Sequence, residues 1–211
     1  MNDHDAPSAM QMATAERRDL AALLAELAPA QWEHRSLCAL WQVRDVAAHV
    51  VSYDQLDPPA VLRRLAEAKL SPSRANQIGV EHARPLTTAQ LVDSFRQHSR
   101  PRGLAASYHG MIGLSDAVIH HQDIRRPLGL ARTIPPERLR AVLNYVRFAP
   151  LMRGPWRVHG LSLEATDIDW RSGHGAPLRG PGEALLMAIA GRADALADLA
   201  GAGKNIIAKR I

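Results

Sequence analysis

The run GLSDAVIHHQDIRR, residues 113–126, is the most informative stretch of this chain. It predicts a helix that ends before Pro127 and Gly129. Asp116 and His120 are four residues apart in this helix. Because four residues turn a helix by about 40°, the two side chains project from one face. A carboxylate and an imidazole so placed are a candidate pair of metal ligands.

His49 offers a third ligand from a distant part of the chain. The run WQVRDVAAH, residues 41–49, leads into a second predicted helix, and His49 lies close to the apolar face of that helix. If the two helices pack side by side, two imidazoles and a carboxylate converge, which is the ligand set of an open divalent metal site, most commonly zinc. Each part also has an ordinary explanation. His49 alone fits a hydrogen-bonded core residue, and Asp116 with His120 fits an exposed helical pair.

Three neighbouring residues leave alternatives open. His109 precedes the carboxylate by one heptad, so it is an alternative ligand, a base behind the site or a surface residue. His121 points about 100° away from His120 and is the less suitable ligand. Asp123 can accept the second ring N–H of His120 and fix its tautomer, or it can pair with Arg126 in solvent.

Cys38 and Arg192 are two further candidates. Cys38 can act as a nucleophile, but no histidine is beside it in the sequence, so a small buried apolar residue is the favoured interpretation. Arg192 is expected inside an otherwise apolar helix at residues 183–199. A guanidinium beside a buried face needs a carboxylate, from the protein or from a ligand. Arg192 is therefore the best anion-binding candidate, with a structural salt bridge as the alternative.

Hydrophobic periodicity predicts helices joined by short connections. The longer helices are expected at residues 9–27, 43–53, 87–99, 108–126 and 136–152. A short helix is expected at residues 59–69, and residues 71–85 are polar and predicted to be irregular. Long helices with short connections describe an antiparallel bundle, and bundles commonly place metal ligands on facing helices.

The pattern changes near residue 154. Residues 156–165 partly alternate apolar with polar and predict a half-exposed strand, and a second short strand is expected at 168–170. The Gly- and Pro-rich residues 171–182 predict a loop before the last long helix. We therefore expect a helix-bundle domain over residues 1–153 and a small α/β domain over residues 154–211.

Composition narrows the class of protein. The chain has 26 basic and 21 acidic residues, which gives a net charge of +5. The basic residues are dispersed and aromatic residues make up only 4%, which argues against a nucleic-acid-binding surface. The positive charge instead favours an anionic small molecule as the ligand. One cysteine excludes an internal disulfide framework and fits a reducing cytoplasm. The polar start at residues 1–7 is no secretory signal, and no apolar run is long enough to cross a membrane.

Three separated motifs resemble the mycothiol-dependent maleylpyruvate isomerase family, a branch of the DinB-like metalloenzymes. The first is Leu37-Cys38 with Trp41 and VRDVAAH at 43–49, and the second is DAVIHHQD at 116–123 with Leu128-Gly129. The third combines ATDIDW at 165–170, GPG at 180–182 and Gly191-Arg192. The likeness covers nearly the whole chain from Leu20 onward.

The resemblance implies a mainly α fold, with a DinB-like four-helix bundle and a small α/β C-terminal domain. It implies a divalent metal, usually zinc, held by His49, Asp116 and His120, with mycothiol bound as thiolate in the fourth position. It also implies that Arg192 clamps a carboxylate of the cofactor or substrate. The expected protein is thus an enzyme that isomerises a small electrophilic and anionic substrate, or conjugates mycothiol to it through the thiol sulfur.

Two other functions fit the same scaffold. One is a non-catalytic protein that binds a small molecule, and the other is a metal-dependent hydrolase in which water replaces the thiol. Two departures from the family pattern bear on the site. Asp116 stands where glutamate is more typical and is one methylene shorter, and Ala39-Leu40 stand where Pro-Gly often precedes the tryptophan.

Overall fold

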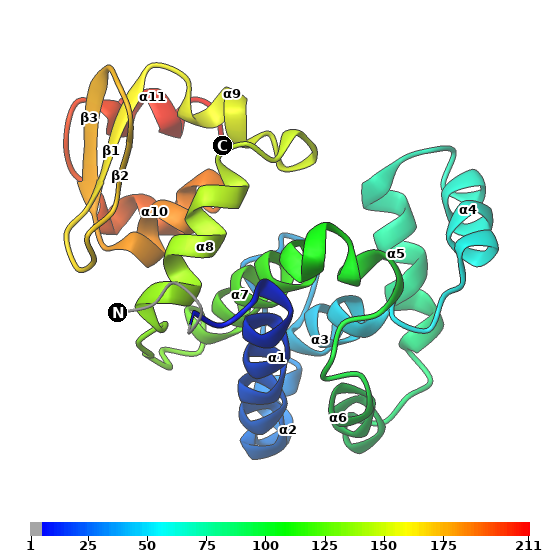
Figure 1. The fold of residues 1–211 in the computed structure, drawn as a ribbon. Helices are drawn as coiled ribbons and strands as arrows, with labels where there is room; N and C mark the ends of the chain where they lie inside the picture. The colour runs from blue at the N-terminus through cyan, green and yellow to red at the C-terminus, as the bar shows by residue number, and fades with distance from the viewer. Residues whose placement is uncertain (1–5) are drawn as a thin grey trace. The chain divides into compact units, whose positions relative to one another are not determined.

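The computed structural model describes residues 6–211, which are mainly helical (Figure 1). The chain divides into two compact units, residues 1–131 and 132–211. Residues 1–5, which belong to the segment where no secretory signal was expected, lie outside the described residues. Within residues 6–211, none of the helices has both the length and the apolar character needed to span a membrane.

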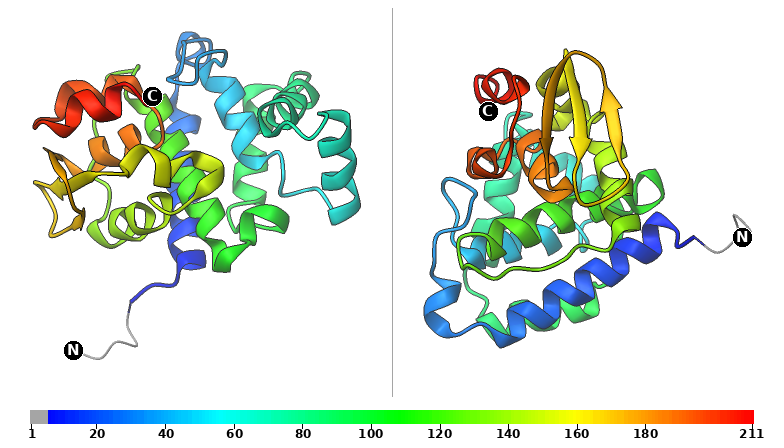
Figure 2. Two further views of the ribbon diagram at one scale, coloured as in Figure 1. Left: turned by 90° about the horizontal axis from the view of Figure 1, so that it is seen from above. Right: turned by 90° about the vertical axis from the view of Figure 1, so that its left-hand side faces the viewer.

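The first unit is built from helices. They are α1 (Ala9–Glu26), α2 (Pro29–Trp32), α3 (Val43–Val51), α4 (Pro58–Glu67), α5 (Pro72–Ala83), α6 (Thr88–Gln97) and α7 (Met111–Arg125). Helix α1 contacts α6 and α7, and α3 contacts the same two helices (Figure 2). These four helices form the bundle, and their apolar faces share one core, which includes Leu20, Val46, Leu91, Phe95 and Ile124.

Local capping explains where several of these helices begin. Ser8 accepts a hydrogen bond from the Gln11 N–H before α1, and the Gln11 side chain accepts one from the Ser8 N–H in return. Thr87 and Gln90 make the same reciprocal pair before α6. Both caps satisfy backbone donors that a helix start leaves open.

The prediction that residues 71–85 are irregular is wrong, because they contain α5. The Ser71 side chain accepts a hydrogen bond from Arg74 N–H, and Pro72 occupies the first turn, where its fixed φ suits a helix. Ala75 and Ile78 are buried in a small cluster with Ala68. The apolar face of α5 is short and lies among polar residues, so its hydrophobic periodicity is too weak to predict a helix from the sequence.

A buried ion pair joins α1 to the turn that follows α3. Arg17 Nη1 lies 2.8 Å from Asp54 Oδ1, and both side chains are fully buried. Arg17 also donates to the carbonyl oxygens of Val50 and His98. A charge buried in a core requires such partners, so Arg17 determines how α1 meets the chain that follows α3 and α6.

The second unit combines helices with a small sheet. Its helices are α8 (Pro136–Val146), α9 (Gly154–Val158), α10 (Gly182–Ile189) and α11 (Gly203–Ala208). Its strands are β1 (Leu161–Ala165), β2 (Arg171–Gly173) and β3 (Ala176–Gly180). Strand β1 is central, antiparallel to β2 and parallel to β3. The predicted fold, mainly α with a four-helix bundle and a small α/β part, is confirmed.

The division of the chain differs from the expected one. The units separate between Ala131 and Arg132, so the expected boundary between residues 153 and 154 lies inside the second unit. Helix α8 packs on α10, and Asn144 at its C-terminal end accepts a hydrogen bond from Trp170 Nε1. Periodicity shows that α8 has an apolar face, but it does not show which element covers that face.

Three details of the second unit also differ from expectation. Residues 154–158 are helical, so the first strand begins only at Leu161. The segment expected as a loop at 171–182 holds β2 and β3, while residues 168–170 form no strand. The last long helix ends at Ile189, and Gly191 follows with a φ of 91°. Arg192 therefore lies in a turn, and its expected place inside a helix is wrong.

Candidate metal centre

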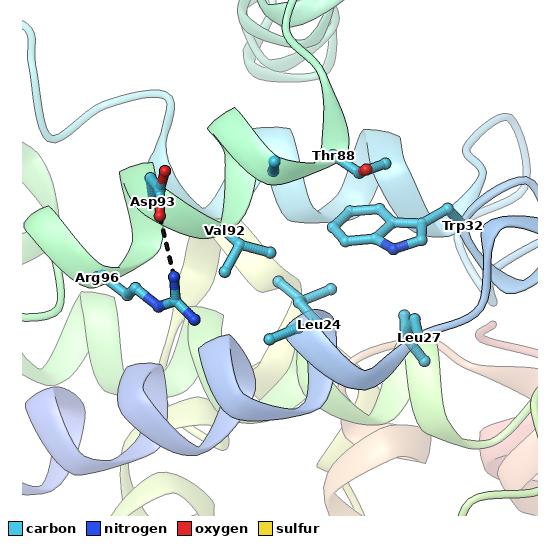
Figure 3. A pocket seen from close by; sticks show the side chains of 9 residues that line it. Leu24, Leu27, Trp32, Thr88, Val92, Asp93 and Arg96 are labelled. Carbon is cyan, nitrogen blue, oxygen red and sulfur yellow. Dashed lines mark hydrogen bonds and ion pairs between the residues drawn. The ribbon is translucent and has the colours of Figure 1, made fainter.

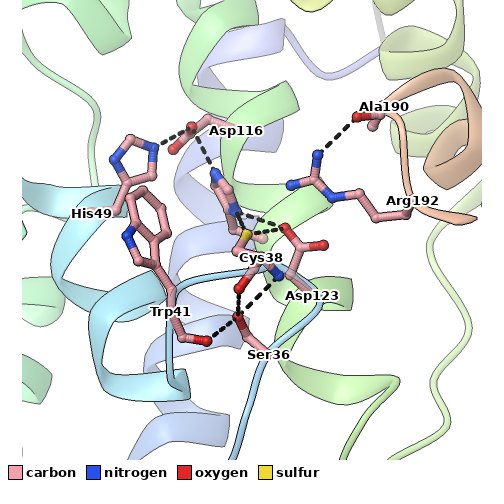
Figure 4. A network of polar contacts seen from close by, with 9 residues as sticks. Ser36, Cys38, Trp41, His49, Asp116, Asp123, Ala190 and Arg192 are labelled. Carbon is pink, nitrogen blue, oxygen red and sulfur yellow. Dashed lines mark hydrogen bonds and ion pairs between the residues drawn. The ribbon is translucent and has the colours of Figure 1, made fainter. Parts of the chain in front are cut away.

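His49, Asp116 and His120 converge in the first unit, as the sequence predicts. Helix α3 carries His49, α7 carries the other two, and the helices are in contact. Asp116 Oδ1 lies 3.4 Å from His49 Nε2 and 3.5 Å from His120 Nε2 (Figure 4). One donor atom from each residue lies within 4.8 Å of the others. The three residues can therefore hold one cation.

The site is closed around the imidazoles and opens at the carboxylate. The exposed fractions of the side chains are 8% for His49, 11% for His120 and 29% for Asp116. The Trp41 ring lies 5.0 Å from the His49 ring and 6.4 Å from the His120 ring, measured between centroids. Tyr53 meets His49 edge-on at 6.4 Å. Aromatic packing thus fixes the His49 ring.

The charges of this site are strongly coupled. Burial acts to raise the pKa of Asp116, but the charge of His120 and the contacts with both imidazoles hold that pKa well below its usual range. Burial acts to lower the pKa of His120, yet the Asp116 carboxylate holds it well above its usual range, helped by Asp123 and Cys38. The site without a metal therefore keeps an ionised carboxylate and a protonated His120 at neutral pH.

Asp123 lies behind His120, as one of its two interpretations expected. Its Oδ2 is 2.8 Å from His120 Nδ1. This contact sets the ring so that Nε2 faces Asp116. A carboxylate that orients a ligating imidazole is a frequent feature of metal sites.

Cys38 is partly buried against the apolar core, as the favoured interpretation expected, but its thiol also belongs to the same group of polar contacts. Its Sγ lies 3.2 Å from Asp123 Oδ2 and 3.8 Å from His120 Nδ1. The side chain is half-buried. Cys38 and His120 are 82 positions apart in the chain, so a search among sequence neighbours could not find this pair.

The other histidines near α7 take different places. His109 has a φ of 58° and lies at a kink in the short 3-10 helix Tyr108–Gly110 that precedes α7, exposed to solvent. The expected heptad relation to Asp116 therefore does not exist. His121 is buried on the side of α1, where its Nδ1 lies 2.7 Å from Glu16 Oε1. The prediction that His121 points away from the site is confirmed.

Helix α5 contributes residues that the sequence did not reveal. Gln77 accepts a hydrogen bond from Trp41 Nε1 at 2.9 Å, and Asn76 accepts one from the Tyr53 hydroxyl at 2.8 Å. These two amides hold the aromatic rings that pack on His49. No signal pointed to them, because α5 itself was not expected.

Arg192 lies in the second unit, half-buried, in the turn that follows α10. Its guanidinium donates a hydrogen bond to the Ala190 carbonyl oxygen at 2.8 Å. Its role as a clamp for an anionic group stays a prediction.

A separate groove of about 380 Å³ lies in the first unit between α1 and α6 (Figure 3). Leu24, Trp32 and Val92 form its apolar part, and the ion pair of Asp93 with Arg96 lies at its edge. None of the predicted ligands lines this groove, so it is distinct from the metal centre.

The family match concerns the first half of the chain. Residues 13–106 match the family model described as mycothiol maleylpyruvate isomerase N-terminal domain. This part of the chain is similar to that N-terminal domain. The expected resemblance to this family is thereby confirmed, and the matched range contains the first of the three sequence motifs. The matched range includes His49 but ends before Asp116. The choice of Asp116 and His120 as candidate ligands therefore rests on the geometry of the site.

The whole chain also has the fold of solved isomerase structures. One is a crystal structure of a histidine-to-alanine mutant of the mycothiol-dependent maleylpyruvate isomerase, with 16% identity and a TM-score of 0.62. Another is a crystal structure of the mycothiol-dependent maleylpyruvate isomerase, with 14% identity and a TM-score of 0.57. Each comparison covers 96% of this chain and 95% of the other. No curated protein matches the sequence.

We expect the protein without metal to lose stability as pH rises. The folded chain holds a proton on His120, with its raised pKa, that the unfolded chain releases near pH 6.5. The free energy of unfolding therefore falls from about pH 6.5 up to the raised pKa of His120, by at most about 1.4 kcal/mol per pH unit. The lowered pKa of Asp116 acts at the other end, where stability is lost as pH falls below about 4. Urea unfolding of chelator-treated protein at several pH values measures both slopes.

A His120→Gln variant should lose the slope above about pH 6.5, whereas the exposed His34→Gln variant should keep it. A flat profile in the unmodified protein over this range would contradict the assignment.

Proposed function

We propose that this protein is a divalent-metal-dependent enzyme that uses mycothiol as a thiolate cofactor. It isomerises a small electrophilic and anionic substrate, or conjugates mycothiol to that substrate through the thiol sulfur. His49, Asp116 and His120 are the proposed metal ligands, and zinc is the proposed metal. The observation that carries the proposal is the position of Asp116 Oδ1, 3.4 and 3.5 Å from the two imidazole Nε2 atoms.

These distances fit coordination of one ion better than direct hydrogen bonds. An N–H···O hydrogen bond is about 2.7–3.2 Å long. Tetrahedral zinc, with bonds of about 2.0–2.2 Å to nitrogen and oxygen, keeps neighbouring donor atoms about 3.3–3.6 Å apart. The shorter side chain of Asp116, where the family more typically has glutamate, still reaches both imidazoles at this spacing.

A divalent metal held by these three residues would have room for a thiol as a further ligand. A divalent cation bound there would lower the pKa of a bound thiol, and mycothiol would then supply a sulfur nucleophile at neutral pH. Asp123 and Trp41 orient and shield the imidazoles that would bind the metal ion. Asp123 keeps the proton of His120 on Nδ1, so that the Nε2 lone pair faces the ion. The Trp41 ring packs beside both imidazoles and limits the access of water to them.

We further propose that Arg192 binds a carboxylate of the cofactor or the substrate. The Gly191-Arg192 motif and the planar donor fork of the guanidinium support this role. The cytoplasm is the proposed location, because a single cysteine fits a reducing compartment. Neither a nucleic acid nor a membrane is a proposed partner.

Changing a ligand histidine should abolish zinc binding and leave the fold intact. We expect His49→Ala and His120→Ala to contain no stoichiometric zinc, because two remaining ligands hold the ion weakly. His174→Ala, an exposed histidine of the second unit, is the matched control and should keep the zinc of the unmodified protein. Elemental analysis with circular dichroism measures both properties. An unchanged zinc content in both ligand variants would refute the assignment.

Turnover should require a thiol. We expect zinc-loaded protein to consume an electrophilic unsaturated carboxylate, with maleylpyruvate as the first compound to assay, only when mycothiol is added. Asp116→Asn should reduce the rate at least about a hundredfold, since a neutral ligand weakens metal binding. Turnover without a thiol would indicate the metal-dependent hydrolase instead. Saturable binding of the compound with no turnover would indicate the non-catalytic binding protein.

Arg192→Ala should weaken the binding of mycothiol or of the anionic substrate by roughly tenfold to a hundredfold, the cost of a hydrogen bond to a charged group. Arg171→Ala is the matched control, because this exposed arginine pairs with Glu164 in the same unit. Calorimetric titration measures the affinities. Equal affinities in the two variants would remove Arg192 from the site.

A further inference from the structure

The turn from Ser36 to Trp41 is fixed to the helix that carries the metal centre. Ser36 Oγ donates to the Trp41 carbonyl oxygen at 2.8 Å and accepts from the Cys38 N–H at 3.1 Å. The Leu37 N–H donates to the Asp123 carbonyl oxygen of α7 at 3.0 Å. Backbone and side-chain hydrogen bonds thus hold Cys38 at a defined place beside α7.

From this turn the Cys38 thiol reaches the carboxylate behind His120. Its Sγ lies 3.2 Å from Asp123 Oδ2, and the same oxygen lies 2.8 Å from His120 Nδ1 (Figure 4). The Asp123 side chain is fully buried. A carboxylate removed from water needs hydrogen-bond donors. The thiol and the imidazole N–H therefore donate to one oxygen and orient it together.

We propose that Cys38 is a positioning residue of the metal centre, which acts on His120 through Asp123. The thiol holds the carboxylate at the edge of the ring where Nδ1 lies, so that Nε2 is presented to the ion beside Asp116. This inference rests on the proposed function, because it requires a metal bound to His120. It assigns Cys38 a role that neither the nucleophile nor the apolar-residue interpretation contains.

The distances argue against a second cation bound by Cys38, His120 and Asp123 themselves. Donor atoms around one tetrahedral zinc are about 3.3–3.7 Å apart, given zinc–sulfur bonds of about 2.3 Å and zinc–nitrogen bonds of about 2.0–2.1 Å. The 2.8 Å between His120 Nδ1 and Asp123 Oδ2 is shorter and is the length of a charge-assisted hydrogen bond. The group is therefore a support for the metal centre.

Zinc affinity of the full chain, measured by competition with a chromophoric chelator, tests the proposal. We expect Cys38→Ala to weaken zinc binding by about tenfold or more, the usual cost of losing a group behind a ligand. Cys38→Ser should stay within about threefold of the unmodified protein, because a hydroxyl can also donate to Asp123. Ser73→Ala, at an exposed position of α5, should change nothing.

Coupling to Asp123 separates positioning from a general loss of stability. If Cys38 acts through Asp123, then Cys38→Ala should have little further effect on zinc affinity in an Asp123→Asn background. Additive losses in this double-mutant cycle would overturn the proposal, and so would equal affinities of the Cys38→Ala variant and the unmodified protein. Failure of serine to restore binding would do the same.

The cobalt-substituted protein separates positioning from ligation. We expect no thiolate-to-cobalt charge-transfer absorption, because Cys38 does not bind the ion. Such a band, lost in Cys38→Ser, would make Cys38 a ligand and overturn the proposal while the metal centre stands. Absence of zinc binding by the unmodified protein would instead overturn the proposed function together with this inference.

Discussion

The packing of α3 on α7 is the constraint on which the candidate metal centre depends. Apolar residues of α3, such as Val46 and Val50, are buried in the bundle core together with Ile124 of α7. That burial holds the helices in one register and brings His49 to the residues 116–120 of α7. Imidazoles and a carboxylate at the margin of an apolar core are costly unless they satisfy one another or bind an ion. Hydrophobic packing thus buries polar groups that a bound metal ion would stabilise.

Local spacing made part of the site predictable. The four-residue step from Asp116 to His120 places both on one face of any helix, and the heptad argument for His109 failed only because the helix starts at Met111. The spacing alone does not determine convergence with His49, since convergence depends on which helices become neighbours. The contact of Cys38 with Asp123 depends on the same tertiary arrangement.

The elements that the sequence did not reveal have weak periodicity. Helix α5 buries a short face on a polar chain, although it holds Trp41 through Gln77. In the second unit, glycines suggested a loop where Gly173 and Gly180 in fact end short strands. Gly191 has a positive φ just after α10, which ends the helix. Arg192 therefore lies outside the helix in which it was expected. Composition signals turns, but it does not distinguish a turn between strands from a longer loop.

The central claim is that one ion binds the side chains of His49, Asp116 and His120. A crystal structure of the zinc-loaded protein, with anomalous diffraction recorded on both sides of the zinc absorption edge, tests it directly. We predict one anomalous peak within about 2.0–2.2 Å of the two Nε2 atoms and of Asp116 Oδ1. A zinc peak at another place, with these three side chains in direct contact and no ion between them, would contradict the account.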